Sequence, residues 1–160
     1  MSARRVLVAG IGNVFLGDDG FGVEVVSRLG LRPQPEGVET ADFGIRGFDL
    51  AYALMDGYDL AVLVDALPLG KPAGTISVIE PDLDGADAAD GFDSHGMNPM
   101  EVFRLVKHFG GRLPRVLIVG CEPESLGPED EGRMGLSETV TGSVGTAVDV
   151  VSQLLEREAV

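Results

Sequence analysis

The stretch VLVAGIGNVFLGDDGFG, residues 6–22, decides the fold of this chain. It opens with an apolar run that ends at Gly10, which is typical of a parallel strand buried on both faces. A loop follows with two adjacent acidic residues, Asp18 and Asp19, and from Gly20 onward Val23, Val26 and Leu29 share one helical face. A buried strand that leads through a loop into an amphipathic helix begins a β-α-β unit, so we expect an α/β fold.

The rest of the chain continues this alternation. We expect further strands at 37–41, 60–64, 74–79 and 116–119, and helices at 20–31, 48–55, 99–109 and from a capping Ser137 onward. The strand at 74–79 follows its predecessor after a short turn, so it should run antiparallel to that strand or lie at an edge, because a parallel crossover needs more chain. The order predicts a three-layer α/β/α sandwich with a mostly parallel sheet of about five strands, in a single domain over 1–160.

Composition excludes several classes of partner. The 160 residues carry a formal net charge of −14, and so acidic a surface repels nucleic acid phosphates and anionic lipids. The single cysteine, Cys121, cannot form an intrachain disulfide, and no apolar stretch is long enough for a membrane span or a signal sequence. These features predict a cytoplasmic protein that binds neither nucleic acid nor membrane.

The GIGN sequence at 10–13 invites a dinucleotide-binding interpretation, with Asp42 in the place of the ribose-binding acid. The third glycine of that fingerprint would fall at position 15, where this chain has Phe15. Asp18 and Asp19 would also repel a pyrophosphate at the helix N-terminus. A nucleotide site is therefore disfavoured, and the simplest alternative for the acidic pair is that one of them caps the helix.

Three polar side chains follow strands of the expected sheet, directly or after a loop: Asp19, Asp65 and His95. Ligands in open α/β sheets bind at the carboxyl ends of the strands, where all three can meet. Two carboxylates and one imidazole make a three-ligand set with an open position, as catalytic divalent-metal sites require, although the mixture does not name the metal. Each has a plainer alternative: Asp65 can simply accept backbone N–H groups, and His95 can be a solvated loop histidine.

Other chemistries find less support in the sequence. It contains neither HExxH nor G-x-S-x-G, and Cys121 has no Cys or His at metal-ligand spacing. His108 suits the C-terminal end of its helix and is interpreted as structural. Two acidic stretches, 80–93 and 122–131, flank the predicted site; a solvated surface is the simpler interpretation, and a lid or docking surface is the alternative.

Taken as a series, these segments resemble the [NiFe]-hydrogenase maturation endopeptidases across the whole chain. The matching segments are residues 6–22 for the N-terminal signature, VLVDA at 62–66, SHGM at 94–97 for the histidine loop, GCEPESL at 120–126 and GLS at 135–137. The family's Asp-Gly-Gly after the second strand appears here as Asp42-Phe43-Gly44. Asp19 stands where some members have Glu.

The resemblance implies a protease that removes the C-terminal extension of the hydrogenase large-subunit precursor once nickel is installed. It implies that Asp19, Asp65 and His95 are both the metal-contacting and the catalytic residues, in an aspartic-type endopeptidase. The nickel would come with the substrate, so we expect the isolated protein to be metal-free, and we expect a monomer. The alternative is a chaperone on the same fold that binds nickel and the precursor without cutting.

Overall fold

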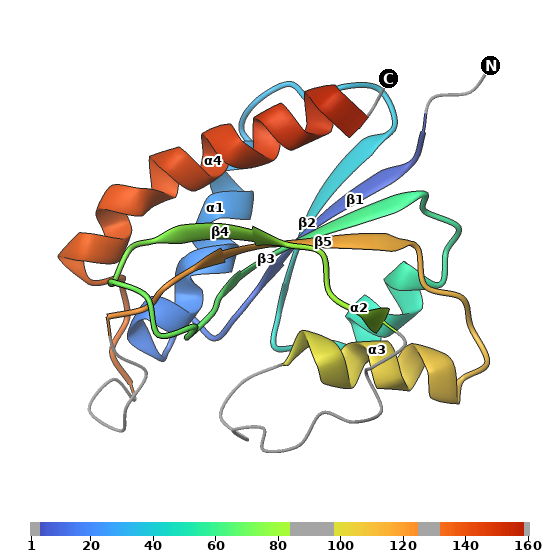
Figure 1. Ribbon diagram of the computed structural model, residues 1–160, viewed down its shortest axis with the longest axis horizontal. Helices are drawn as coiled ribbons and strands as arrows, with labels where there is room; N and C mark the ends of the chain where they lie inside the picture. The colour runs from blue at the N-terminus through green and yellow to red at the C-terminus, as the bar shows by residue number, and fades with distance from the viewer. Residues whose placement is uncertain (1–3, 84–97, 125–131, 159–160) are drawn as a thin grey trace.

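The computed structural model describes residues 4–83, 98–124 and 132–158. Its elements, in chain order, are β1 (Val6–Ile11), η1 (Gly17–Gly20), α1 (Phe21–Leu29), β2 (Val38–Gly44), α2 (Gly47–Leu54), β3 (Leu60–Ala66), β4 (Ile76–Ile79), α3 (Pro99–His108), β5 (Arg115–Cys121) and α4 (Glu138–Glu158). The strands form one sheet in the order β2-β1-β3-β5-β4. Helices α1 and α4 cover one face and α2 and α3 the other (Figure 1), which confirms the predicted three-layer sandwich.

The first strand explains why its sequence is continuously apolar. Val6 and Val8 belong to the core under α1 and α4, whereas Leu7, Ala9 and Ile11 belong to the core under α2 and α3. Alternate side chains of a strand point to opposite faces, and both faces are covered here, so no position is left for a polar residue.

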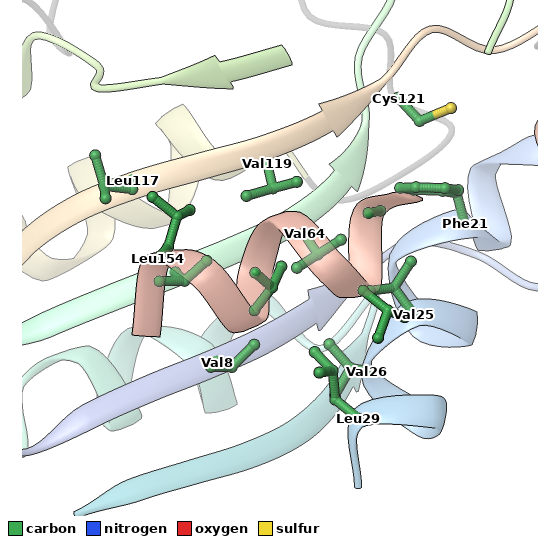
Figure 2. Packing of buried hydrophobic residues seen from close by; sticks show 14 of the residues in the cluster. Val8, Phe21, Val25, Val26, Leu29, Val64, Leu117, Val119, Cys121 and Leu154 are labelled. Atoms are coloured by element: carbon green, nitrogen blue, oxygen red, sulfur yellow. The ribbon is translucent and has the colours of Figure 1, made fainter. Parts of the chain in front are cut away.

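Figure 2 shows the core beneath α4, where Val8, Val64 and Val119 project from three neighbouring strands. The apolar stripe predicted for the last helix is buried against them: Val140, Val144, Ala147, Val148, Val151 and Leu155. Ser137 caps this helix as predicted, because its Oγ accepts the N–H of Val140 at 3.3 Å. None of the helices in the described ranges combines the length and hydropathy needed to cross a membrane.

Two elements differ in detail from the sequence-based expectation. In α1, Val25 is fully buried and Val23 only partly, because the helix begins at Phe21 and turns that residue and Val25 inward. The strand β4 lies at the sheet edge as predicted, but its antiparallel neighbour is β5 rather than its predecessor β3. Since β5 is inserted between them, the connection from β3 crosses the carboxyl end of β5, where the N–H of Leu67 bonds the carbonyl of Cys121 at 2.9 Å.

The strand order creates a switch point between β1 and β3. The chain leaves β1 through α1 towards β2 on one side, then returns through α2 to β3 on the other side. The connections diverge at the carboxyl ends of β1 and β3, and such divergence is where open α/β sheets bind their ligands. Any functional group placed there lies at the favoured position of the fold.

Two glycines bring the start of α1 directly onto this switch point. A Cβ on Gly22 would lie 2.0 Å from the Val64 carbonyl oxygen and 2.5 Å from that of Ile11, so only hydrogen fits between the helix and strands β3 and β1. A Cβ on Gly10 would lie 2.6 Å from the Gly22 carbonyl oxygen. The close approach fixes the preceding turn, η1, over the ends of both strands.

We predict that Gly22→Ala lowers the free energy of unfolding by at least about 2 kcal/mol, because the added methyl must push the helix away from two backbone carbonyls. Urea denaturation measures the change. Gly145→Ala is the matched control: a Cβ at that exposed position of α4 meets no atom within 4 Å. It should leave stability unchanged or raise it by up to about 1 kcal/mol through helix propensity. Equal effects of the two substitutions would contradict the close-packing argument.

Candidate active site

Asp19 lies in η1, within a tightly closed loop at the switch point. Its Oδ2 accepts the backbone N–H of Asn13 at 2.8 Å, and its own N–H donates to the Leu16 carbonyl at 3.1 Å. Gly12 makes the closure fit: its φ is +139°, and a Cβ there would lie 1.8 Å from the Asp19 carbonyl oxygen. The glycine-rich loop therefore serves to wrap the backbone around Asp19, which is a different use from cradling a phosphate.

Asp65 is the second carboxylate of this region and lies within β3, one residue before the strand ends. Its side chain is buried, and its Oδ1 accepts the N–H of Ala66 at 2.8 Å. Burial, followed by the nearby charge of Asp19, raises the pKa of Asp65 well above its ordinary value, and the Ala66 hydrogen bond only partly opposes this. The two acids thus interact electrostatically, and Asp65 keeps its proton to a higher pH than an ordinary aspartate.

The structure brings together two of the three predicted site residues. Asp19 and Asp65 come from η1 and β3, which are in contact. His95 lies outside the described residues, so its position relative to the two acids stays a prediction. Within the described ranges no three His, Cys, Asp or Glu side chains gather as metal ligands would. Of the predicted ligand set, these ranges contain only the two carboxylates.

Asp18 has a different role from its neighbour, and sequence reasoning missed it. The side chain is 4% exposed. Its Oδ1 accepts the N–H of Ser137 at 2.7 Å, and its Oδ2 accepts the N–H of Glu124 at 2.9 Å and the Ser137 hydroxyl at 2.9 Å. One carboxylate therefore joins η1 to the segment after β5 and to the start of α4.

The helix-capping interpretation of the acidic pair is wrong. The N-cap of α1 is Gly20, which makes no side-chain cap, and the carboxylates of Asp18 and Asp19 turn to loop backbone instead. Because Gly22 draws the helix start down onto the strands, the η1 turn precedes it and takes both acids away from the free N–H groups of the first helical turn. Nothing in the sequence connects Asp18 with Ser137, which lies 119 residues later.

Glu122 is another buried acid at this edge, and it corrects the solvated-surface interpretation at its position. It is 7% exposed, and its Oε1 accepts the N–H groups of Leu69 at 2.8 Å and Lys71 at 2.9 Å. It thereby holds the β3–β4 connection against the end of β5. Glu80 fits the solvated interpretation, as an exposed partner of Arg115 at 3.1 Å. The parts of the two acidic stretches at 84–93 and 125–131 lie outside the described residues.

Cys121 is a packing residue in the described structure. It is fully buried at the end of β5, and burial, with the charge of Asp18 second, raises its pKa to about 11. A thiol that keeps its proton at neutral pH is neither a nucleophile nor a ready ligand.

The segment Asp42-Phe43-Gly44 forms a fixed turn beside the site. The Asp42 Oδ1 accepts the N–H of Gly44 at 2.8 Å, and the Gly44 carbonyl accepts the N–H of Gly12 at 2.9 Å. Phe43 is buried in the core under α2 and α3, so the residue that replaces the middle glycine of the family pattern anchors this turn.

Comparison with known proteins decides the family. The family model described as hydrogenase maturation protease matches residues 23–154, most of the chain. The chain belongs to the hydrogenase maturation protease family. Relatives of this family support a hydrolase that cleaves peptide bonds.

Individual members of the hydrogenase maturation protease family agree along almost the full length. The hydrogenase 2 maturation protease of Escherichia coli K12 is 31% identical over 159 residues, covering 98% of this chain and 93% of the relative. The structure of the E. coli maturating endopeptidase HybD superposes with a TM-score of 0.80 at 28% identity, covering 96% and 93% of the two chains. A hydrogenase 2 maturation peptidase from a Thaumarchaeota archaeon gives 0.71 at 33% identity, covering 97% and 100%.

We predict that Asp18→Asn lowers the free energy of unfolding by about 2–3 kcal/mol, because an amide group must then face a backbone N–H in either orientation. Both carboxylate oxygens accept backbone donors, so no flip of the amide satisfies them. Chemical denaturation measures the loss. Glu24→Gln is the control, since Glu24 makes only an exposed ion pair with Arg28, and it should change stability by less than about 0.5 kcal/mol. If the two variants were equally stable, Asp18 would not be the anchor described here.

A second prediction concerns Asp65 and pH. Its folded-state pKa is raised, so its contribution to stability is complete at low pH and is lost as pH rises above about 4 towards the folded-state pKa. Asp65→Asn keeps the Ala66 hydrogen bond but does not titrate, so the variant should gain on the wild type by up to about 1.4 kcal/mol per pH unit in that window. Urea denaturation between pH 4 and 8 measures the difference, and parallel stability curves would contradict the raised pKa.

Proposed function

We propose that this protein is an endopeptidase that removes the C-terminal extension from the nickel-loaded large-subunit precursor of a [NiFe]-hydrogenase. The observation that supports the proposal most is the carboxylate pair of Asp19 and Asp65 at the switch point, in a chain of the hydrogenase maturation protease family. A buried acid with a raised pKa beside a second carboxylate is usual equipment of acid–base hydrolysis.

We propose further that nickel is part of the substrate and that Asp19, Asp65 and His95 complete its coordination. The described residues fit this role: Asp65 has one N–H partner, and burial, followed by the charge of Asp19, raises its pKa. A cation between the two acids would relieve their repulsion, and carboxylates with an imidazole suit Ni²⁺. An unloaded precursor would bring no cation and would be left uncut.

The same two acids have the chemistry that cleavage of the peptide bond requires. Asp65 must release its proton before it can act as a ligand, so metal contact and proton release are coupled at this residue. In this proposal one of the two acids also orients a water molecule towards the scissile carbonyl; the Asn13 N–H holds the Asp19 carboxylate, which supports Asp19 in that role. The aspartic-type assignment of the enzyme belongs to this proposal.

The test is a cleavage assay with purified protein and the large-subunit precursor from the same organism, nickel-loaded and nickel-free, followed at the precursor C-terminus by mass spectrometry. We expect cleavage of the loaded form only. Asp19→Ala and His95→Ala should each lower the rate at least about 100-fold, because each removes a contact to the metal. Glu24→Gln, an acid of α1 outside the site, should cut at the wild-type rate.

Each other outcome selects a different conclusion. Binding of the loaded precursor without any cleavage would indicate the chaperone. Cleavage that survives both substitutions would place the site elsewhere, and equal cleavage of loaded and unloaded precursor would remove nickel from recognition.

A further inference from the structure

Three aromatic side chains lie together on the outer surface of the α2–α3 layer. Phe48 and Tyr52 of α2 are each 61% exposed, and Phe109, just after α3, is 41% exposed. The rings of Tyr52 and Phe109 are stacked, with centroids 5.7 Å apart and planes 6° apart, and the Phe48 ring lies 6.4 Å from that of Phe109. The helices that carry them pack side by side on this face (Figure 1).

The packing of the core does not require the exposed rings of α2. The buried positions of α2, Leu50, Ala51 and Leu54, already fill the space above the sheet, so Phe48 and Tyr52 are surplus to folding. Clustered exposed aromatic side chains are uncommon on monomeric proteins and are enriched at the centres of protein interfaces.

The chain segment that carries Phe109 is basic in sequence, unlike the protein as a whole. Residues 104–115, RLVKHFGGRLPR, hold four of the 12 basic residues and no acid, in a chain of net charge −14. Arg115 is paired with Glu80 and Glu158, and Lys107 donates to the Leu83 carbonyl. The positive charge that this segment offers a partner is therefore that of Arg112.

Arg112 is the basic group best placed to bind a partner. It is exposed and makes no hydrogen bond or ion pair with the residues that the structure describes. The preceding Gly111 packs on Met55, where a Cβ would lie 2.3 Å from the sulfur, so the backbone before Arg112 lies against the C-terminal end of α2. Arg112 follows Phe109 by three residues. Arg and Tyr are among the residues enriched in interface hot spots.

The α2 side of this surface begins near the carboxyl edge of the sheet. Helix α2 starts three residues after β2 ends at Gly44, and Ile45 between them is 55% exposed. The Gly44 carbonyl accepts the N–H of Gly12, and Gly12 packs on Asp19. A macromolecule that presents a bond to Asp19 therefore lies over the sheet edge from which α2 begins.

We propose that Phe48, Tyr52, Phe109 and Arg112 form a docking surface for the body of the large-subunit precursor, which meets it with an apolar side chain flanked by carboxylates. The inference rests on the proposed function, and it adds a binding surface outside the metal-contacting residues. Acidic character of the partner follows from the exposed Arg112, and apolar character from the exposed rings.

The experiment measures KM and kcat for cleavage of the nickel-loaded precursor by two variants, Phe48→Ser with Tyr52→Ser, and Arg112→Glu. We expect each to raise KM about tenfold with kcat nearly unchanged, because the substitutions remove contacts made equally in the ground and transition states. For Arg112→Glu the increase should shrink at high salt. The control is Leu31→Ser with Arg32→Glu, an exposed apolar and basic pair beyond α1, and it should leave KM unchanged.

Unchanged KM in both docking variants, or an equal rise in the control, would overturn the proposal while leaving the endopeptidase intact. A wild-type dimer in sedimentation that Tyr52→Ser dissociates without affecting KM would overturn it in favour of a second copy as the occupant. If the wild type binds but does not cut the precursor, the proposed function fails, and co-elution decides the docking surface separately. Weaker co-elution of both variants then supports it, and equal co-elution overturns it.

Discussion

The candidate site depends on the direct contact of α1 with the backbones of β1 and β3. Side chains normally separate a helix from the sheet that it covers, whereas Gly10 and Gly22 let this helix start in contact with the Val64 carbonyl. That contact places η1 over the strand ends, close enough for the charge of Asp19 to act on Asp65. A larger residue at either glycine would move one acid away from the other, so backbone packing sets the electrostatics of the site.

Two buried acids at this edge of the sheet, Asp18 in η1 and Asp65 in β3, acquire opposite roles through their surroundings. Asp18 is buried among three hydrogen-bond donors, which saturate its oxygens and fix three chain segments around the site. Asp65 is equally buried but has one backbone donor, so its negative charge is poorly compensated. The two carboxylates therefore differ in role. Asp18, whose oxygens are saturated with hydrogen bonds, holds the edge of the sheet together, and Asp65 keeps the capacity to bind a cation or a proton.

The features that the sequence predicts are those that depend on interactions between residues close together in the chain. Apolar periodicity is local, so the strands, the capped final helix and the three layers could be read from it, and so could the positions of Asp19 and Asp65 after their strands. The partner of β4 could not, because it depends on β5 entering the sheet between β3 and β4. The roles of Asp18 and Glu122 were missed for a similar reason: their hydrogen-bond partners lie far along the chain, and an acid in a polar loop looks solvated until those partners are in place.

A poorly compensated acid pair lowers the stability of the folded protein, and the proposed function explains why such a pair would be kept. Burial, and after it the charge of Asp19, raises the pKa of Asp65, and this weakens the binding of a free metal ion, because the proton competes for the same oxygens. A nickel ion already bound by substrate ligands needs fewer contacts from the protease, and the bulk of the precursor can supply the remaining affinity through a surface away from the metal. Weak metal binding combined with separate docking favours loaded precursor over both free nickel and empty precursor, because neither of those makes both contacts.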